Sequence, residues 1–185
     1  MDLGSLLARE LTRDELPGAS ALMSTLRPVR ARGYLTRNEF LACCRWKSPR
    51  SIRHCEKNPA QRIRRQSAAA LASRDERVRF EALTTLDGVG APTASAILTL
   101  IDPRRYGVLD IRVWQLLHAL GAVTRKPGGV GFTCDDWCEY LKILRRHARA
   151  LRAPVRAVEY SLFLCHERMH QGVLYGSRGI RIDAS

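Results

Sequence analysis

The sequence predicts an all-α fold, and three observations support this prediction. Signals for helix starts recur along the whole chain, whereas the alternating patterns typical of strands are almost absent. Apolar residues return at helical spacing in several segments. The composition, with 45% hydrophobic residues in a chain of 185, suits one domain, or one core divided into two lobes. We expect this domain to span 1–172 and residues 173–185 to form a flexible tail.

Capping signals locate the helices in the first half of the chain. Thr36 and Glu39 have the spacing of a capping box, in which each side chain bonds the other residue's backbone N–H. Ser48 and Asn58 are each followed by proline, a pair typical of an N-cap and the first helical position. Asp75 is the expected N-cap of the next helix, which leads into a glycine-containing turn.

Helices are also expected in the second half, separated by loops. Residues 93–101 place apolar side chains on one helical face. Asp110 stands before another helix, and the glycine-rich segment 126–131 is the clearest loop. The last two helices are expected at about 134–151 and 154–170.

The charge of the chain indicates a polyanionic partner. Basic residues outnumber acidic ones by 31 to 18, a formal net charge of +13, and neutralising phosphates releases condensed counterions. A solvated basic surface or attraction to anionic lipid is also compatible with this charge. No stretch approaches the roughly 18 apolar residues of a membrane span, and the N-terminus lacks an export signal. We expect a cytoplasmic monomer, nucleoid-associated if bacterial, with no membrane partner.

The six cysteines do not form a recognisable metal site. Their spacing matches neither a zinc finger nor a four-cysteine iron–sulfur site. In a reducing cytoplasm we expect free, buried or half-buried thiols and neither a metal nor a cofactor. The cysteines are Cys43, Cys44, Cys55, Cys134, Cys138 and Cys165.

A turn reading Leu-Asp-Gly-Val-Gly at 86–90 lies between two amphipathic segments. Gly88 and Gly90 tolerate positive φ, so the chain can reverse tightly there. Val89 is expected to point back between the helices. Bare N–H groups at the start of the second helix, with Thr93 in its first turn, can bind a phosphate whatever the sequence. The alternative is an ordinary helical hairpin with a glycine turn.

The segment 83–117 resembles the helix-hairpin-helix/Gly-Pro-Asp superfamily of DNA glycosylases, which includes endonuclease III and the adenine glycosylases. In this family a Leu-x-Gly-Val-Gly hairpin precedes Thr-Ala, and an aspartate follows at the start of a later helix. The matching residues, in order, are Gly88, Gly90, Thr93, Ala94 and Asp110. The resemblance implies a two-lobed helical domain with the helix-hairpin-helix at about 77–101. It also implies double-stranded DNA as partner and excision of a damaged or modified base.

By this resemblance Asp110 is the candidate catalytic residue. Breaking the base–sugar bond builds positive charge on the sugar, and a nearby carboxylate stabilises that charge and can orient or deprotonate the attacking water. The alternative is that Asp110 only caps a helix, since aspartate is common at N-caps.

The chain departs from the family at one position that bears on the mechanism. Bifunctional members carry a lysine immediately before the Thr-Ala pair, which attacks the sugar and forms a Schiff base, whereas this chain has Pro92. The iron–sulfur loop of some members is also missing. A monofunctional glycosylase is therefore expected.

A flipped base leaves a gap that family members fill from a loop after an early core helix. The comparable stretch here is 44–50. Trp46 could stack on a base, while Lys47 and Arg50 could hold phosphates or a base edge. Alternatively, Trp46 belongs to the core and the two cations are solvated.

Two other functions remain open from the sequence. The first is a non-catalytic helix-hairpin-helix protein in which Asp110 is only a cap. The second is a zinc metalloprotease, because His166 and His170 have the H-E-x-x-H spacing. Arg168 between them, the short remaining chain and the high positive charge all count against zinc.

Overall fold

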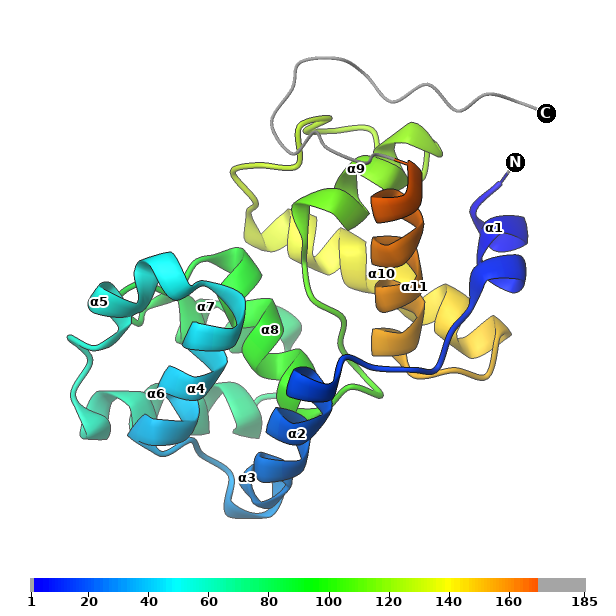
Figure 1. The fold of residues 1–185 in the computed structure, drawn as a ribbon. Helices are drawn as coiled ribbons and strands as arrows, with labels where there is room; N and C mark the ends of the chain where they lie inside the picture. Colours follow the sequence, from blue (N-terminus) through cyan, green and yellow to red (C-terminus); the bar gives the residue numbers. More distant parts are fainter. Residues whose placement is uncertain (1, 170–185) are drawn as a thin grey trace.

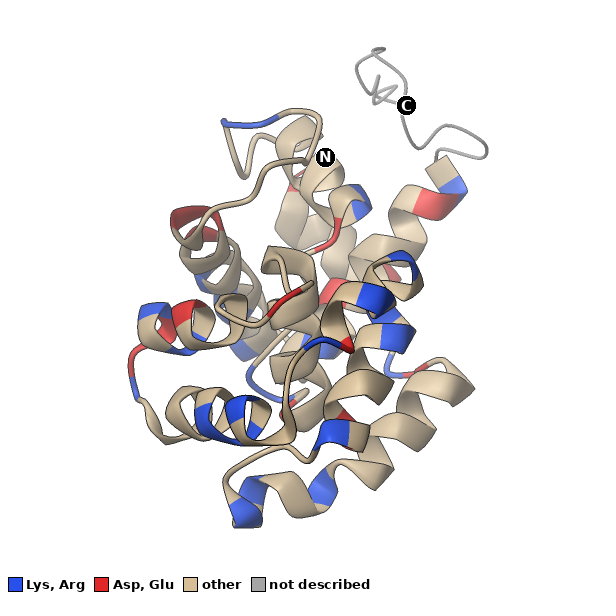
Figure 2. Cartoon of the chain, turned by 90° about the vertical axis from the view of Figure 1, so that its left-hand side faces the viewer, with Lys and Arg blue, Asp and Glu red and all other residues tan. Residues whose placement is uncertain are grey.

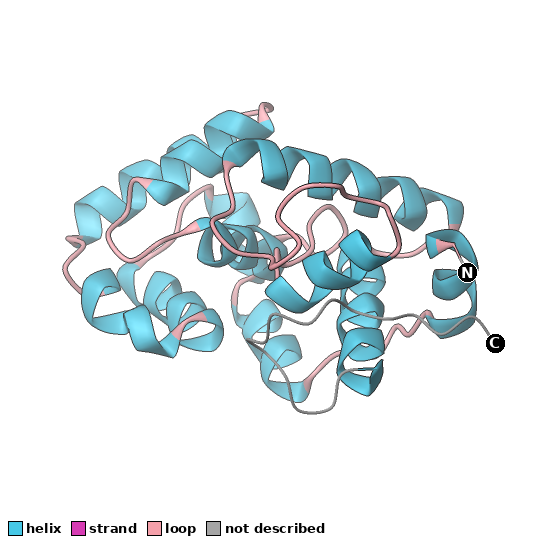
Figure 3. Cartoon of the chain, turned by 90° about the horizontal axis from the view of Figure 1, so that it is seen from above, coloured by secondary structure: helices cyan, strands magenta, loops and turns pink. Residues whose placement is uncertain are grey.

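The computed structural model describes residues 2–169, and every regular element within them is helical (Figure 3). This confirms the predicted fold class. The expected tail at 173–185 lies outside the described residues. The elements are α1 (Leu3–Glu10), α2 (Pro17–Thr25), α3 (Arg27–Arg32), α4 (Arg37–Lys47), the 3-10 helix η1 (Pro49–Ser51), α5 (Ile52–Cys55), α6 (Ala60–Ala72), α7 (Glu76–Thr84), α8 (Ala91–Ile101), α9 (Ile111–Ala119), α10 (Cys134–Ala150) and α11 (Val155–Met169).

The helices gather in two groups (Figure 1). Helices α2 to α8 form one group, and α9, α10 and α11 form the other. Helix α1, although first in the chain, packs against α11 in the second group. The segment 102–110 leaves α8 and runs between the groups to α9. Residues at the end of this segment therefore face both groups of helices.

A continuous core joins the two groups, and a stack of aromatic rings crosses from one to the other. Trp137 of α10 stacks with Phe80 of α7, with ring centroids 6.4 Å apart. Trp137 also stacks with Tyr106 in the connecting segment, with ring centroids 6.2 Å apart. Trp137 and Tyr106 are almost fully buried. Offset aromatic pairs at such distances are favourable beyond the area that they bury, so the stack holds the two groups of helices together.

Most of the predicted helix starts are found where the sequence places them. The capping box of Thr36 and Glu39 forms at the start of α4. The Asp75 side chain accepts from the N–H of Arg77 at the start of α7. Thr133 begins α10 with a second capping box, made with Asp136. These bonds join residues at most three positions apart, so local sequence suffices to predict them.

Of the two predicted caps that precede proline, the one at Asn58 is wrong, and the one at Ser48 is found in position but without a capping bond. Asn58 is not an N-cap, because α6 begins at Ala60 with Pro59 in the cap position. Ser48 occupies the cap position of η1, but its side chain makes no capping bond. Both side chains make contacts across the fold instead, and both contacts lie at the candidate site described below.

The cysteines agree with the expectation of free, buried or half-buried thiols. All six cysteines are free, four of them buried and two half-buried. Burial raises the pKa of Cys43 to about 12, so its thiol stays protonated. Lysine and arginine are spread over most of the helices in Figure 2, with fewer acidic residues between them. Within the part of the chain that the structure describes, no helix has the length and apolarity needed to cross a membrane.

Candidate DNA-binding and active site

The hairpin between α7 and α8 requires glycine at only one of its two predicted positions. Gly88 has φ of +76°, and an added Cβ would lie 2.8 Å from both the backbone N and the Sγ of Cys55. Gly90 is extended, with φ of −91° and ψ of −179°, and an added Cβ would meet only Pro92, at 3.9 Å. The expectation that both glycines serve the reversal of the chain is therefore wrong for Gly90.

The start of α8 presents backbone donors beside this turn. Val89 is buried, as predicted, while Gly90 is exposed. Among the described residues, the N–H groups of Gly90, Ala91 and Thr93 have no hydrogen-bond acceptor, and Pro92 has no N–H to offer. Three unpaired donors at the positive end of an eleven-residue helix suit an anion.

The side chain of Thr93 has a different environment from the one expected of a DNA contact. It is buried, with 3% of its surface exposed, and its hydroxyl lies 3.0 Å from the hydroxyl of Ser48. Any contact of Thr93 with DNA would therefore come from its N–H. The hydroxyl instead ties the start of α8 to the end of α4.

Two residues of the first group of helices, Asn58 and Arg62, bind Asp87 in the hairpin turn. Asn58 accepts a hydrogen bond from the N–H of Asp87 at 3.0 Å and donates to the carbonyl of Asp87 at 2.9 Å. Arg62 of α6 pairs with the Asp87 carboxylate at 3.1 Å. Sequence reasoning missed both roles, because Asn58 lies 29 residues from Asp87 and precedes a proline that suggests a cap.

Asp110 and Lys47, both named as candidates from the sequence, are brought together in the structure. Asp110 is the N-cap of α9, and its Oδ1 accepts from the N–H of Arg112 at 2.9 Å. The Nζ of Lys47, the last residue of α4, donates to the Oδ2 of Asp110 at 2.6 Å. Each side chain has 18% of its surface exposed. The pair joins residues 63 positions apart and is mostly buried, but it still reaches solvent.

Side chains from three helices fix the backbone just before Asp110. The N–H of Leu109 donates to the hydroxyl of Ser95 in α8 at 2.8 Å. The N–H of Val108 donates to the carboxylate of Glu159 in α11 at 3.1 Å. The carbonyl of Val108 accepts from Tyr140 in α10 at 2.7 Å. Val108 and Leu109 lie outside every helix, so these side chains bond backbone groups that a regular element would otherwise pair.

The segment before Asp110 packs tightly against α10 and α11, and two buried residues of these helices have raised pKa values. An added Cβ at Gly107 would lie 2.8 Å from Glu159 Cβ and from Leu144 Cδ1. Burial raises the pKa of Glu159, and the paired guanidinium of Arg156 counteracts this shift. Burial also raises the pKa of Tyr140, with the negative charge of Asp110 among the lesser causes. Ser95, Glu159, Tyr140 and Gly107 together hold Asp110 in place, and the sequence alone pointed to none of them.

The remaining candidates from 44–50 lie in different surroundings. Trp46 is half-buried and packs against the core, and the guanidinium of Arg156 lies 5.9 Å from the centre of its ring. Arg50 is exposed. These contacts favour a packing role for Trp46 and leave Arg50 available to an external anion.

The structure tests the H-E-x-x-H pattern only in part. His166 is buried on α11, and its Nε2 lies 3.2 Å from the Oε1 of Gln115. His170 lies outside the described residues. Within residues 2–169, no group of three or more His, Cys, Asp or Glu side chains is placed to hold a metal ion.

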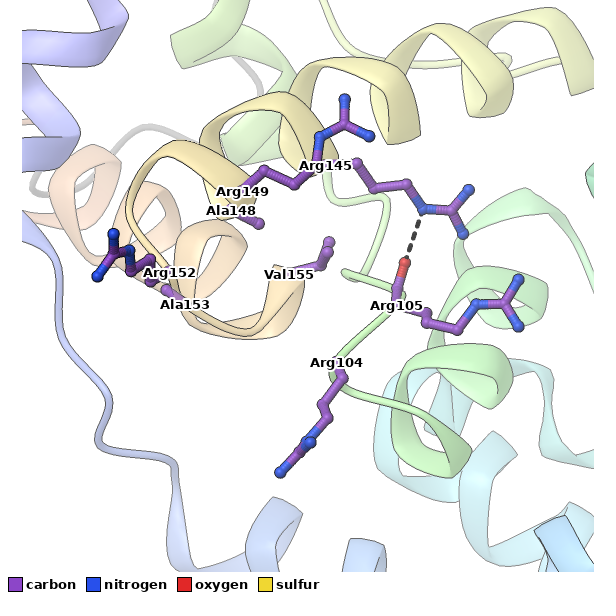
Figure 4. A pocket seen from close by; sticks show the side chains of 8 residues that line it. All are labelled: Arg104, Arg105, Arg145, Ala148, Arg149, Arg152, Ala153 and Val155. Carbon is purple, nitrogen blue, oxygen red and sulfur yellow. Dashed lines mark hydrogen bonds between the residues drawn. The ribbon is translucent and has the colours of Figure 1, made fainter.

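A basic surface separate from the Asp110 site lies near the beginning of the connecting segment 102–110 (Figure 4). It is a groove of about 470 Å³. Arg145 hydrogen-bonds the carbonyl of Arg105 at 3.0 Å and also pairs with Glu76 at 2.8 Å. No residue of the Asp110 site lines this groove. Its arginines are Arg104, Arg105, Arg145, Arg149 and Arg152.

Comparison with known proteins agrees with this geometry. A search of curated proteins and a search of solved structures found no match. One family model matches residues 9–163, which include the hairpin, Lys47 and Asp110, and its description is "Putative 8-oxoguanine DNA glycosylase OGG-like protein". The match covers well over half of the 185 residues. The chain belongs to this family of OGG-like DNA glycosylases.

Proposed function

We propose that the protein removes a damaged or modified base from duplex DNA by hydrolysing the N-glycosidic bond, with Asp110 as the catalytic carboxylate. The observation that carries this proposal is the placement of Asp110. Three helices fix the backbone that leads to it, and its side chain still reaches solvent. A residue that served only as a helix cap would need neither a preceding backbone held by three side chains nor the Lys47 amine at 2.6 Å from its carboxylate.

The chemistry of base removal accounts for a fixed carboxylate. The sugar gains oxocarbenium character as the base leaves, and a negative charge held in place stabilises that state without reorganising. The same oxygen atoms can accept a proton from the attacking water. The hairpin would hold a phosphate by its backbone N–H groups and so set the position of the DNA relative to Asp110.

The family description makes oxidised guanine the first base to test. Duplexes that each carry one lesion, including 8-oxoguanine, uracil and hypoxanthine, would be incubated with the protein and then treated with alkali to break abasic sites. We expect alkali-sensitive breaks at one lesion, or at a small group of related lesions. If none of the duplexes is cut while the protein still binds them, the non-catalytic alternative is supported instead.

Binding to undamaged duplex should be electrostatic and little dependent on sequence. The net charge of +13 and the backbone donors of the hairpin both favour phosphate contacts. The logarithm of the affinity should fall linearly with the logarithm of the salt concentration, by about 0.9 for each phosphate neutralised. Fluorescence anisotropy over a salt series measures this slope. An affinity that stays constant from low to moderate salt would contradict this interpretation.

A further inference from the structure

We propose that Lys47 gives the protein a second activity, the cleavage of the DNA strand at an abasic site through a covalent imine. This inference rests on the proposed function, because the product of base removal is an abasic deoxyribose whose open form carries an aldehyde at C1′. Lysine amines form Schiff bases with carbonyl groups. Pro92 excludes an amine from the start of α8, but the fold places another one beside Asp110.

Lys47 is distinguished from the other lysines by its position. Its Nζ lies 2.6 Å from the Oδ2 of Asp110, and 18% of its side chain is exposed. Lys57 and Lys142 are exposed. Lys126 pairs with the buried Asp136 of α10. Among the described lysines, only Lys47 pairs with the residue that we propose to act on the sugar.

The neighbourhood of Lys47 also suits a reaction on bound DNA. Lys47 ends α4, and the next residue, Ser48, is tied to Thr93 at the start of α8. The free N–H groups of Gly90, Ala91 and Thr93 belong to the same helix start. A phosphate held there would bring the neighbouring sugar towards Lys47 and Asp110.

The two side chains can complete the reaction with no other reagent than water. Asp110 takes a proton from the Lys47 ammonium, and the neutral amine adds to the C1′ aldehyde while one of the amine's own protons moves to the aldehyde oxygen, which becomes a hydroxyl. Asp110 returns that proton to the departing hydroxyl, so water leaves and an iminium ion forms. The Asp110 carboxylate then removes a proton from C2′, the electron pair forms the C2′–C3′ double bond, and the C3′–O bond breaks to release the 3′ phosphate. Water finally hydrolyses the iminium ion and frees the amine.

An ion pair that merely links the two groups of helices is the structural alternative. The substitution Lys47→Arg distinguishes the two roles, because arginine keeps the charge and can still pair with Asp110 but cannot form an imine under these conditions. A purely structural pair would tolerate arginine in every assay. Lys57→Arg and Lys142→Arg are the matched controls, since they make the same change at exposed lysines.

The experiment uses a duplex in which one abasic site has been made beforehand by removing uracil, so that base recognition plays no part. Borohydride reduces an iminium ion to a stable amine, which links protein to DNA. We expect the wild-type chain to form a covalent complex and, without borohydride, to cut the strand on the 3′ side of the site. Lys47→Arg should reduce both products to background, at unchanged DNA affinity and melting temperature. Both control variants should react like the wild type, and peptide mapping should place the adduct at residue 47.

The proposal is overturned if the wild type forms no adduct, or if Lys47→Arg forms as much as the wild type. Base release from a lesion duplex, scored after alkali, is measured separately on the same proteins. Release without an adduct leaves a hydrolytic, monofunctional glycosylase, as the sequence predicts, and removes the role of Lys47. An adduct without release from any lesion would support Lys47 and overturn the proposed base excision.

Discussion

Replacing Asp110 by asparagine is expected to lower the rate of base excision by about 100-fold or more, the scale of losing one electrostatic stabiliser of a transition state. Asparagine is as good an N-cap as aspartate, so its oxygen can still accept the bond from Arg112 and α9 should form normally. Its amide nitrogen replaces the Oδ2 that accepts from Lys47, so the substitution also removes that ion pair. What it lacks is the negative charge that would face the sugar. Single-turnover excision on the preferred lesion measures the effect.

Asp75→Asn is the matched control for this substitution. Asp75 is also an N-cap whose side chain accepts from the N–H two residues later, at 2.8 Å, but it lies at the exposed start of α7. This variant should excise the base at the wild-type rate. Both variants should bind duplex DNA as the wild type does, and Asp110→Asn could bind more tightly because it has lost a negative charge. Full excision by Asp110→Asn would reduce Asp110 to a cap and direct the search to other acidic residues.

Replacing Gly88 by valine is expected to destabilise the fold strongly, whereas the same change at Gly90 should not. At Gly88 a β-branched residue would be forced to φ of +76°, which costs roughly 1–3 kcal/mol. Its Cβ would also lie 2.8 Å from the backbone of Cys55, so α5 or the turn must shift. A total of about 3 kcal/mol would lower the melting temperature of a chain of this size by roughly 6–12 °C.

Gly90→Val provides the comparison at the other glycine of the hairpin. The backbone there is extended, and an added Cβ has only a normal contact with Pro92. The melting temperature should therefore stay within a few degrees of wild type, since each kcal/mol of lost stability lowers it by roughly 2–4 °C. The side chain would stand beside the free N–H groups of α8 and should weaken binding to every DNA sequence alike. Thermal unfolding and anisotropy separate the two effects. Equal melting temperatures for the two variants would contradict the assigned backbone roles.

Features built from neighbouring residues could be predicted from the sequence alone. The capping boxes at Thr36 and Thr133 and the caps at Asp75 and Asp110 use donors and acceptors within three positions, so the residue types determine them. The hairpin follows from a glycine that adopts positive φ between two helices with apolar faces. These local signals were enough to predict the helical class and the hairpin, which the structure shows, and the family, which the match over residues 9–163 confirms.

The tertiary structure alone decided which distant side chains meet. The local sequence predicts caps at Asn58 and Ser48, but the side chain of each has a partner more than 25 residues away, at Asp87 and Thr93. Nothing in the sequence near Asp110 indicates that Ser95, Tyr140 and Glu159 would hold its backbone, because a hydrogen bond between distant segments depends on how the helices pack. Lys47 was a candidate for phosphate or base contact, and only the fold places its amine on Asp110. The chemistry of the site depends on that meeting, since two residues 63 positions apart are brought together by packing rather than by local propensity.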